Sequence, residues 1–294
     1  MYHRFPHPCR FEAQCAHLRK HYTPVLLTEA AARLRGTEPI EEGLVVVTVD
    51  DGYRDFLENA FPVLCQYDIP ATVFLTTDMP DRNSWLWVDQ VTFCIRQSPV
   101  REIALNIGGR ERWALDTTEK RGQAAVSIKE AMKTIPNQER LAVLARLPRL
   151  LEVDLPEQPP ESHVPLCWDD VRMLAKRGVE FGAHTQTHPI LSRLSGIEQL
   201  RAEIHGSKQR IEQETGIEVN HFCYPNGTSA DFTAEAVDIV KAAGFSTAVT
   251  GTTGVNRIGS NLLELRRIGV EPHDDDMRFL RSVAGYGIPQ RLTA

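Results

Sequence analysis

Short apolar runs alternate with amphipathic segments along most of this chain. In the clearest run, Val45–Val49, four of five residues are valine, which is typical of a strand buried on both faces. Similar runs, and a short segment at the start, predict strands at 1–5, 71–76, 179–183, 220–224, 245–250 and 267–270. Apolar residues at helical spacing predict helices between them, at 10–21, 28–34, 59–67, 168–177, about 200–215, 233–243 and 274–283. We expect Thr28 and Asn59 to cap the helices that they begin.

Strands that alternate with helices predict an α/β protein with a parallel sheet. About seven such units favour a barrel over an open sheet, although periodicity is compatible with both.

The segment between about Met79 and Pro165 interrupts this alternation. Two strand-like runs, 103–107 and 111–115, flank Gly108-Gly109, which is a hairpin signal. Helices are predicted up to about Gln97 and then at 118–134 and 137–151. Because the segment has little apolar material of its own, we interpret 79–165 as an insertion of a hairpin plus helices. The whole chain, 1–294, is then a single catalytic domain.

Composition excludes some classes of protein. The 294 residues include 42% hydrophobic and 24% charged side chains, which are ordinary globular values. A net charge of −6 without a basic stripe argues against nucleic-acid binding. No apolar run approaches the ~18 residues of a membrane span, and no signal region begins the chain. The sequence as written therefore predicts a cytoplasmic protein, whose oligomeric state is left open. The six cysteines form no C-x-x-C pair, so we expect reduced thiols.

Acidic and histidine side chains follow two of the predicted strands. Asp50 and Asp51 come directly after the valine run, and His184 and His188 follow the strand at 179–183. The carboxyl ends of parallel strands carry the active site in such folds. If the residues between the histidines form one helical turn, both imidazoles share a face. With Asp51 they would make a three-ligand zinc site that leaves a position for water. Each motif alone is also compatible with a turn or with structural histidines.

The residues 48–52, Thr-Val-Asp-Asp-Gly, together with 184–188, His-Thr-Gln-Thr-His, resemble the paired signature of the polysaccharide deacetylases. These are the NodB-homology enzymes, or carbohydrate esterase family 4. Valine replaces the usual phenylalanine of the first motif. The stretch 222–227 is similar to the F-x-Y-P-x-G form of the third motif, and Tyr2-His3-Arg4 and Arg266-Arg267-Ile268 resemble the exopolysaccharide-associated branch. The resemblance implies a distorted (β/α) barrel of about seven parallel strands.

The resemblance also implies roles for the residues of these motifs. Asp51, His184 and His188 would bind a divalent metal, which we expect to be Zn²⁺, although Co²⁺, Ni²⁺ or Fe²⁺ also suit such ligands. Water activated by the metal would attack the acetyl carbonyl, with Asp50 as general base. Arg267 would orient that carboxylate.

Further roles concern the substrate and the proton donor. The backbone N–H of Asn226 would stabilise the oxyanion. His3 is expected to be the general acid, with His273 as the competing candidate. Residues expected to contact the sugar are Tyr224, Pro225, Trp87 and Asp89, with Trp85 beside them; core packing is the alternative for the tryptophans.

We therefore expect a metal-dependent hydrolase that removes N-acetyl groups, with O-acetyl groups as a second option, from a carbohydrate. Its partner would be an N-acetylated sugar, an oligosaccharide or a lipid-linked glycan. Two alternatives stay open. One is an amide or imide hydrolase on the same scaffold that acts on a non-sugar. The other is a catalytically silent carbohydrate-binding member of a polysaccharide assembly complex.

Overall fold

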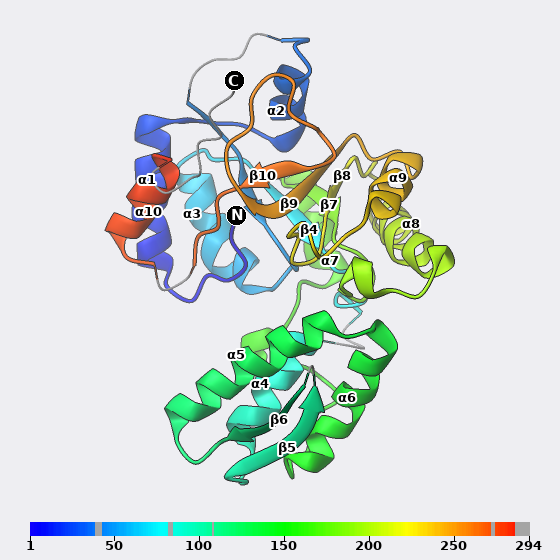
Figure 1. The fold of residues 1–294 in the computed structure, drawn as a ribbon. Helices are drawn as coiled ribbons and strands as arrows, with labels where there is room; N and C mark the ends of the chain where they lie inside the picture. The colour runs from blue at the N-terminus through cyan, green and yellow to red at the C-terminus, as the bar shows by residue number, and fades with distance from the viewer. Residues whose placement is uncertain (39–42, 82–84, 108, 272–273, 286–294) are drawn as a thin grey trace, which may run out of the picture.

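A six-stranded parallel sheet forms the centre of the protein (Figure 1). The computed structural model describes residues 1–38, 43–81, 85–107, 109–271 and 274–285. The strand order is β10 (Leu265–Arg267), β9 (Thr247–Thr253), β8 (His221–Cys223), β7 (Glu180–Ala183), β4 (Ala71–Leu75) and β3 (Val47–Val49). Each neighbouring pair is parallel. A separate two-stranded parallel pair joins β1 (Thr23–Pro24) to β2 (Leu44–Val45).

The first two residues connect the two outer strands of this sheet. Tyr2 pairs with Val49 of β3, donating its N–H to the Thr48 carbonyl at 2.9 Å. Met1 contacts the chain that follows β10, because its carbonyl accepts from the Val270 N–H at 3.0 Å. The sheet is therefore curled into a half-barrel, and the predicted fold class is confirmed. The strand predicted at 1–5 is reduced to the single bridge at Tyr2, and the strand predicted at 267–270 ends at Arg267.

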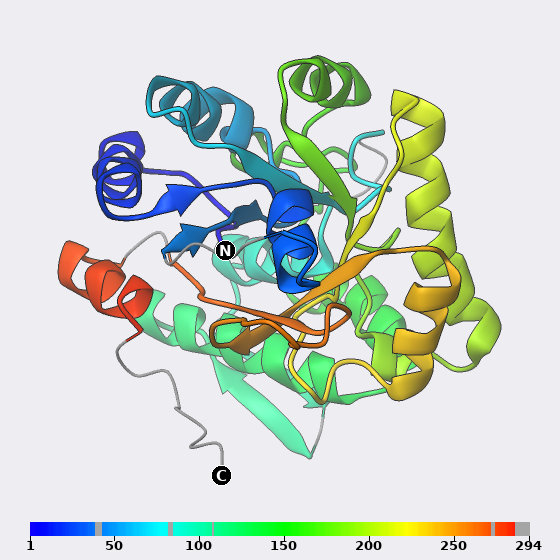
Figure 2. The ribbon, with the colours of Figure 1, turned by 90° about the horizontal axis from the view of Figure 1, so that it is seen from above.

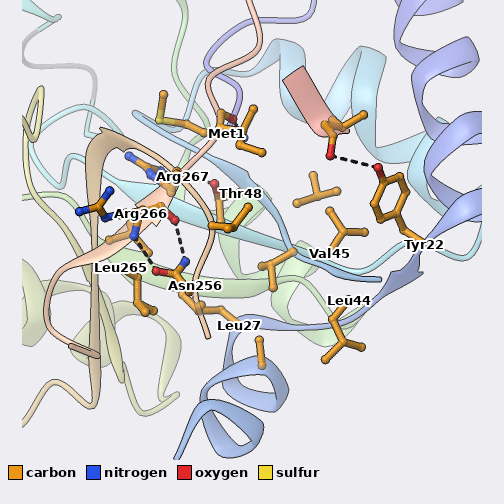
Figure 3. A pocket seen from close by; sticks show the side chains of 18 of the residues that line it. Met1, Tyr22, Leu27, Leu44, Val45, Thr48, Asn256, Leu265, Arg266 and Arg267 are labelled. Carbon is orange, nitrogen blue, oxygen red and sulfur yellow. Dashed lines mark hydrogen bonds between the residues drawn. The ribbon is translucent and has the colours of Figure 1, made fainter. Parts of the chain in front are cut away.

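Next to this closure, a cavity of about 400 Å³ lies between β3 and β10 (Figure 3). Its lining is mostly apolar and comes from the strands and from helices α1 (Pro8–His21), α2 (Leu27–Leu34) and α10 (Asp276–Val283). It includes Leu27, Val45, Leu265 and Phe279.

Helices surround the sheet on its outer face (Figure 2). They are α1 and α10, the π-helical turn η1 (Phe56–Ala60) with α3 (Phe61–Gln66), α7 (Trp168–Lys176), α8 (Ile197–Thr215) and α9 (Ala234–Ala242). Two predicted caps are wrong. Asn59 lies inside the helical segment and donates to the Phe5 carbonyl instead. Thr28 is the second residue of α2 and directs its hydroxyl to Glu180.

Alternation along the strands sorts side chains between the helices and the barrel interior, because successive strand residues face opposite sides. Val49, Val73, Phe181 and Phe222 belong to the large core cluster under the helices. A smaller apolar cluster contains Phe74, Cys223, Val249 and Leu265. Phe74 and Cys223 directly follow Val73 and Phe222 along their strands, so they face the opposite side of the sheet. By the same alternation Asp50, His184 and Arg267 face inward at the carboxyl end of the barrel.

The interruption between β4 and α7 folds beside the barrel (Figure 1). It consists of α4 (Trp87–Gln97), the antiparallel hairpin β5 (Glu102–Ile107) and β6 (Arg110–Ala114), α5 (Thr118–Thr134) and α6 (Asn137–Leu150). These elements bury their own apolar cluster, with Trp113, Ile128 and Leu147 at its centre. The expectation that this segment has little apolar material is wrong, because each element supplies a narrow apolar face and the faces converge. The assignment of the chain to one domain stays a prediction.

Among the described residues, no helix combines the length and the apolar character that crossing a membrane requires.

Candidate active site

Four strands deliver the residues of the candidate site to one end of the barrel. Asp50 and Asp51 follow β3, and the His184–His188 loop follows β7. Cys223 ends β8, and Arg267 ends β10. These side chains are buried, so their charges and hydrogen bonds act in a region of low dielectric.

Asp51, His184 and His188 meet as the metal-ligand hypothesis requires. The Nε2 atoms of both histidines lie 3.6 Å from Asp51 Oδ1. Two ligands, each about 2.1 Å from an ion, stand about 3.4 Å apart at a tetrahedral angle. The observed spacing therefore fits a single cation among the three groups.

The expected helical turn between the two histidines is wrong. Residues 184–190 have no helical structure, and Thr185 and His188 adopt left-handed φ angles of 67° and 56°. Glu203 of α8 holds this loop by accepting from the Gln186 N–H at 2.8 Å and the Thr187 N–H at 3.0 Å. A strained turn fixed by a neighbouring helix, not a helical face, brings the imidazoles together.

An unsatisfied oxygen and the protonation of the histidines in this trio also fit a cation. Asp51 Oδ1, which faces both imidazole Nε2 atoms, is buried without a hydrogen-bond partner among the described residues. His184 Nδ1 lies 2.7 Å from the Cys223 carbonyl, which assigns the proton to Nδ1 and leaves the Nε2 lone pair for a ligand. Burial, together with the charge of Asp50, raises the pKa of Asp51 well above its usual value. Burial lowers the pKa of His184 to about 4 and also lowers that of His188, so both imidazoles are neutral, as metal ligands must be.

The turn after β3 separates the two adjacent acids. Asp51 and Gly52 have φ angles of 74° and 90°, and a Cβ on Gly52 would lie 2.6 Å from the Leu75 side chain. Glycine is thus required for the turn that directs Asp51 to the histidines and leaves Asp50 facing Arg267.

Asp50 and Arg267 form a buried bidentate ion pair. Arg267 Nη1 and Nη2 donate to Asp50 Oδ1 and Oδ2 at 2.7 and 2.8 Å. Burial alone would raise the pKa of Asp50, but the charge and hydrogen bonds of Arg267 hold it below its usual range. Asp50 is therefore an ionised carboxylate in a fixed orientation.

His3 reaches the same carboxylate from the N-terminal segment. Its Nε2 lies 3.7 Å from Asp50 Oδ2, and its side chain is 41% exposed. The competing residue, His273, lies outside the described residues. The described geometry thus brings His3 to the site.

Asn226 follows β8 in a turn with a φ angle of 55°. Its side-chain Nδ2 is buried without a hydrogen-bond partner in the described part of the chain. Its neighbours differ from expectation, because Tyr224 is only 1% exposed, stacks on Phe232 and donates to the Leu263 carbonyl. Pro225 is buried as well. By strand alternation Tyr224 faces the helices with Phe222, so its predicted contact with sugar is not supported.

Trp87 and Asp89 lie at the start of α4, where the insertion meets the barrel. Trp87 is 3% exposed and donates its Nε1–H to the His188 carbonyl at 3.1 Å. It therefore supports the His184–His188 loop and offers no free ring face to a sugar. Asp89 accepts from the Tyr53 hydroxyl and lies 3.6 Å from His163 Nε2. Trp85 is also buried, at 4% exposed.

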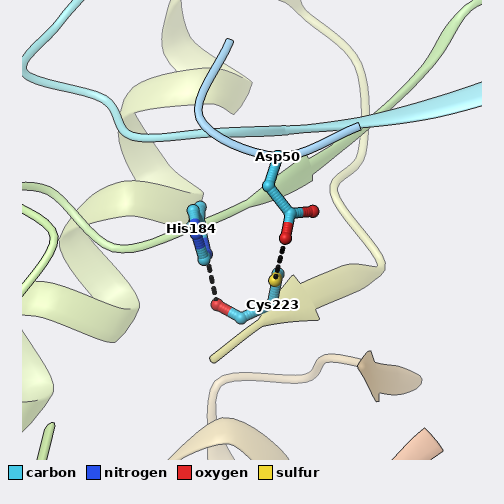
Figure 4. A group of neighbouring side chains, drawn as sticks. All are labelled: Asp50, His184 and Cys223. Atoms are coloured by element: carbon cyan, nitrogen blue, oxygen red, sulfur yellow. Dashed lines mark hydrogen bonds between the residues drawn. The ribbon is translucent and has the colours of Figure 1, made fainter. Parts of the chain in front are cut away.

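A second set of possible metal ligands shares His184 with the first. Asp50, His184 and Cys223 have ligand atoms within 4.8 Å of one another (Figure 4). Arg267 already supplies a positive charge there, with Nη2 3.1 Å from Cys223 Sγ. Because two cations would compete for the same carboxylate, the set around Asp51 is the better metal site.

Sequence reasoning missed three residues that support this site: Glu203, Tyr53 and Cys223. Glu203 and Tyr53 have no local signal, because their roles arise from packing between distant segments. Cys223 has one. Alternation within 220–224 places Cys223 on the opposite face from Phe222 and Tyr224. That opposite face is the one that Asp50 and His184 share.

A family model described as polysaccharide deacetylase matches residues 37–248. Among curated proteins, the poly-β-1,6-N-acetyl-D-glucosamine N-deacetylase of Escherichia coli K12 is 41% identical over 59 residues. This match covers 20% of the chain and only 9% of that enzyme's length. The same enzyme of E. coli O157:H7 matches equally.

Solved structures share the fold. The Streptococcus pyogenes deacetylase PplD, in complex with acetate, is similar with a TM-score of 0.61 and 17% identity, covering 94% of this chain and 86% of that one. IcaB from Ammonifex degensii is similar with a TM-score of 0.61 and 19% identity, covering 96% of this chain and 93% of that one. The BpsB deacetylase domain from Bordetella bronchiseptica is similar with a TM-score of 0.54 and 15% identity, covering 92% of this chain and 85% of that one. At these identities the likeness concerns the fold alone.

Proposed function

The chain belongs to the polysaccharide deacetylase family, and from that premise we propose that it removes N-acetyl groups from a carbohydrate by metal-dependent hydrolysis. One observation supports this most: an unpaired oxygen of Asp51 and two neutral imidazoles converge beside a carboxylate that Arg267 keeps ionised. A structural cluster would not need buried polar atoms without partners.

Asp51, His184 and His188 would hold the divalent cation. When bound, such a cation polarises a carbonyl oxygen and makes a water molecule more acidic. Zn²⁺ suits two neutral imidazoles and one carboxylate best, and Co²⁺, Ni²⁺ and Fe²⁺ are compatible with the same ligands.

Asp50 would act as the general base. Both of its oxygens are held by Arg267, so the carboxylate is fixed in direction and ionised at neutral pH. It can accept the proton of the attacking water without first having to lose one.

His3 would act as the general acid. It lies on the same side of the site as Asp50, 3.7 Å from Oδ2, and can therefore pass a proton to the departing sugar amine. Burial lowers the pKa of His3, although the charge of Asp50 opposes this effect. The acid must be the protonated imidazole, which the nearby charge of Asp50 favours. The backbone N–H of Asn226, in the turn after β8, would donate to the oxyanion.

The substrate class proposed is a glycan of N-acetylated hexosamine, either as a polymer or oligosaccharide or linked to a lipid. The E. coli relative is named for poly-β-1,6-N-acetyl-D-glucosamine, so this polymer is the first substrate to test. Asp89 pairs with His163 in the insertion, where their side chains are 17% and 21% exposed, and we propose Asp89 as a contact for sugar hydroxyls.

The test compares acetate release by zinc-loaded wild type and Asp50→Asn. The panel contains poly-β-1,6-N-acetyl-D-glucosamine, chitooligosaccharides and small non-sugar amides. We expect release from at least one glycan by the wild type and a loss of several hundred-fold or more in Asp50→Asn, since a general base contributes about 10²–10⁴-fold. Calorimetric zinc titration of both proteins shows whether Asp50→Asn still binds metal. Equal, negligible release from every glycan, or release from small amides alone, would overturn the proposal.

A further inference from the structure

Cys223 lies between the two charged residues that the catalytic proposal depends on. It is the last residue of β8 and is fully buried. Its Sγ lies 3.5 Å from Asp50 Oδ2 (Figure 4). Arg267 Nη2 lies 3.1 Å from the same sulfur. Arg267 Nη2 also donates to Asp50 Oδ2 at 2.8 Å, so the three groups form a closed ring of contacts.

We propose that the Cys223 thiol is a positioning residue that fixes the carboxylate of Asp50 by donating its S–H to Oδ2 while its sulfur accepts from Arg267. The expected effect on catalysis rests on the proposed function. The hydrogen bond from Cys223 to Asp50 does not depend on that function.

The directions of these hydrogen bonds follow from the chemistry of the groups. A guanidinium only donates, and an ionised carboxylate only accepts. A thiol is the one member of the ring that can do both. Arg267 has no lone pair to receive the thiol hydrogen, and two acceptors are within reach: Asp50 Oδ2 at 3.5 Å and the Tyr224 carbonyl at 3.8 Å. The hydrogen is assigned to Asp50, because its oxygen is the nearer acceptor and carries a charge.

The backbone of Cys223 supports the neighbouring metal ligand. Its carbonyl lies 2.7 Å from His184 Nδ1, so one residue contacts both the proposed base and a proposed ligand. The carbonyl contact survives any side-chain substitution at 223. Variants of the thiol thus probe Asp50 while leaving the hydrogen-bond partner of His184 in place.

A weak donor suits this position. A thiol hydrogen bond restrains the carboxylate but withdraws little of its basicity. Alanine removes the donor. Serine keeps a donor on a shorter bond, so it reaches Oδ2 less well and should restore only part of the effect.

The kinetic experiment uses the zinc-loaded full chain and the glycan that gives the most acetate release. We expect Cys223→Ala to lower kcat about five- to tenfold, the equivalent of one modest hydrogen bond, with KM and zinc stoichiometry unchanged. Cys223→Ser should lie between wild type and Cys223→Ala. The matched control is Cys15→Ala, since Cys15 is equally buried but packs in the outer core; it should keep the wild-type kcat. A kcat for Cys223→Ala equal to that of Cys15→Ala would overturn the proposal.

An infrared measurement tests the hydrogen bond even if the chain releases no acetate. The S–H stretching band of Cys223, identified by its loss in Cys223→Ala, should lie at lower frequency than that of Cys15. In Asp50→Asn it should move to higher frequency, because a neutral amide is a weaker acceptor than a carboxylate. A Cys223 band that stays in place in Asp50→Asn would overturn the proposed hydrogen bond, whatever the activity.

Discussion

Replacing Arg267 with methionine keeps much of the side-chain volume but removes the guanidinium that faces Asp50. Both residues are buried, at 8% and 2% exposed, so water cannot replace the lost partner. At an effective dielectric of 20, two charges about 4 Å apart attract by about 4 kcal/mol. Removing one member of a buried pair typically costs about 3–5 kcal/mol. We therefore expect Arg267→Met to lower the free energy of unfolding of the metal-free protein by that amount at pH 7.

The pH dependence gives this prediction a definite sign. In the wild type the pKa of Asp50 lies below its usual value, so the stability contributed by the ionised carboxylate persists well into the acid range. Without Arg267, burial dominates and raises that pKa. The variant is then most destabilised at neutral pH and regains stability as the carboxyl is protonated. The difference between the two proteins should narrow as the pH falls toward about 4.

Urea denaturation with a chelator present, followed by tryptophan fluorescence, measures these free energies. Arg201→Met is the control, because Arg201 pairs with Glu198 at 3.1 Å where the side chains are 54% and 80% exposed. The double variant Asp50→Asn, Arg267→Met should recover part of the loss. The reasoning is refuted if Arg267→Met is no less stable than Arg201→Met, or if the loss grows on acidification.

Three further predictions concern parts of the fold around the site. Burial would raise the pKa of Glu180, but hydrogen bonds from His221, Thr28 and Thr72 and the charge of His221 lower it to about 2. Glu180→Gln should therefore cost up to about 3 kcal/mol at pH 7, and the difference should vanish as the pH falls from about 4.5 to about 2; a loss independent of pH in urea denaturation would contradict this. Trp87→Phe removes the donor to the His188 carbonyl, so calorimetry should show about tenfold weaker zinc binding. Trp113 donates its Nε1–H to Ser127 within the insertion, so the control variant Trp113→Phe should bind zinc as the wild type does. Gly182→Ala places a Cβ 2.6 Å from the Phe74 ring and should lower the free energy of unfolding by about 1–3 kcal/mol. Gly122→Ala, with open space around it in α5, should raise the free energy of unfolding by up to about 1 kcal/mol. Thermal unfolding that ranks the two variants in the opposite order would refute the packing argument.

The strands were predictable because a strand buried on both faces needs a continuous apolar run. The runs at 71–76 and 179–183 correspond to β4 and β7 within about one residue at each end. The valine run was less simple, because Val45 pairs with β1 whereas Val47 pairs with β4. Tertiary pairing divides one apolar run between two sheets, and local sequence does not encode that division.

The site was predictable as far as its motifs extend. Asp51, His184 and His188 come together as expected, but the left-handed turn at Thr185 and His188 has no glycine to announce it. The buried roles of Trp87 and Tyr224 depend on which face of each element is covered. The sequence alone does not distinguish an aromatic residue that faces a ligand from one that packs in the core.

The ion pair between Asp50 and Arg267 also has a consequence for the order of folding. The two residues are 217 positions apart, so a nascent chain makes Asp50 long before its counter-charge. A chain that ends before β10 would have to bury that carboxylate without a guanidinium, which is costly. The stability that this ion pair contributes therefore appears only when β10 has joined the sheet. Incomplete chains should stay open to proteolysis, and the complete chain becomes resistant once β10 has docked.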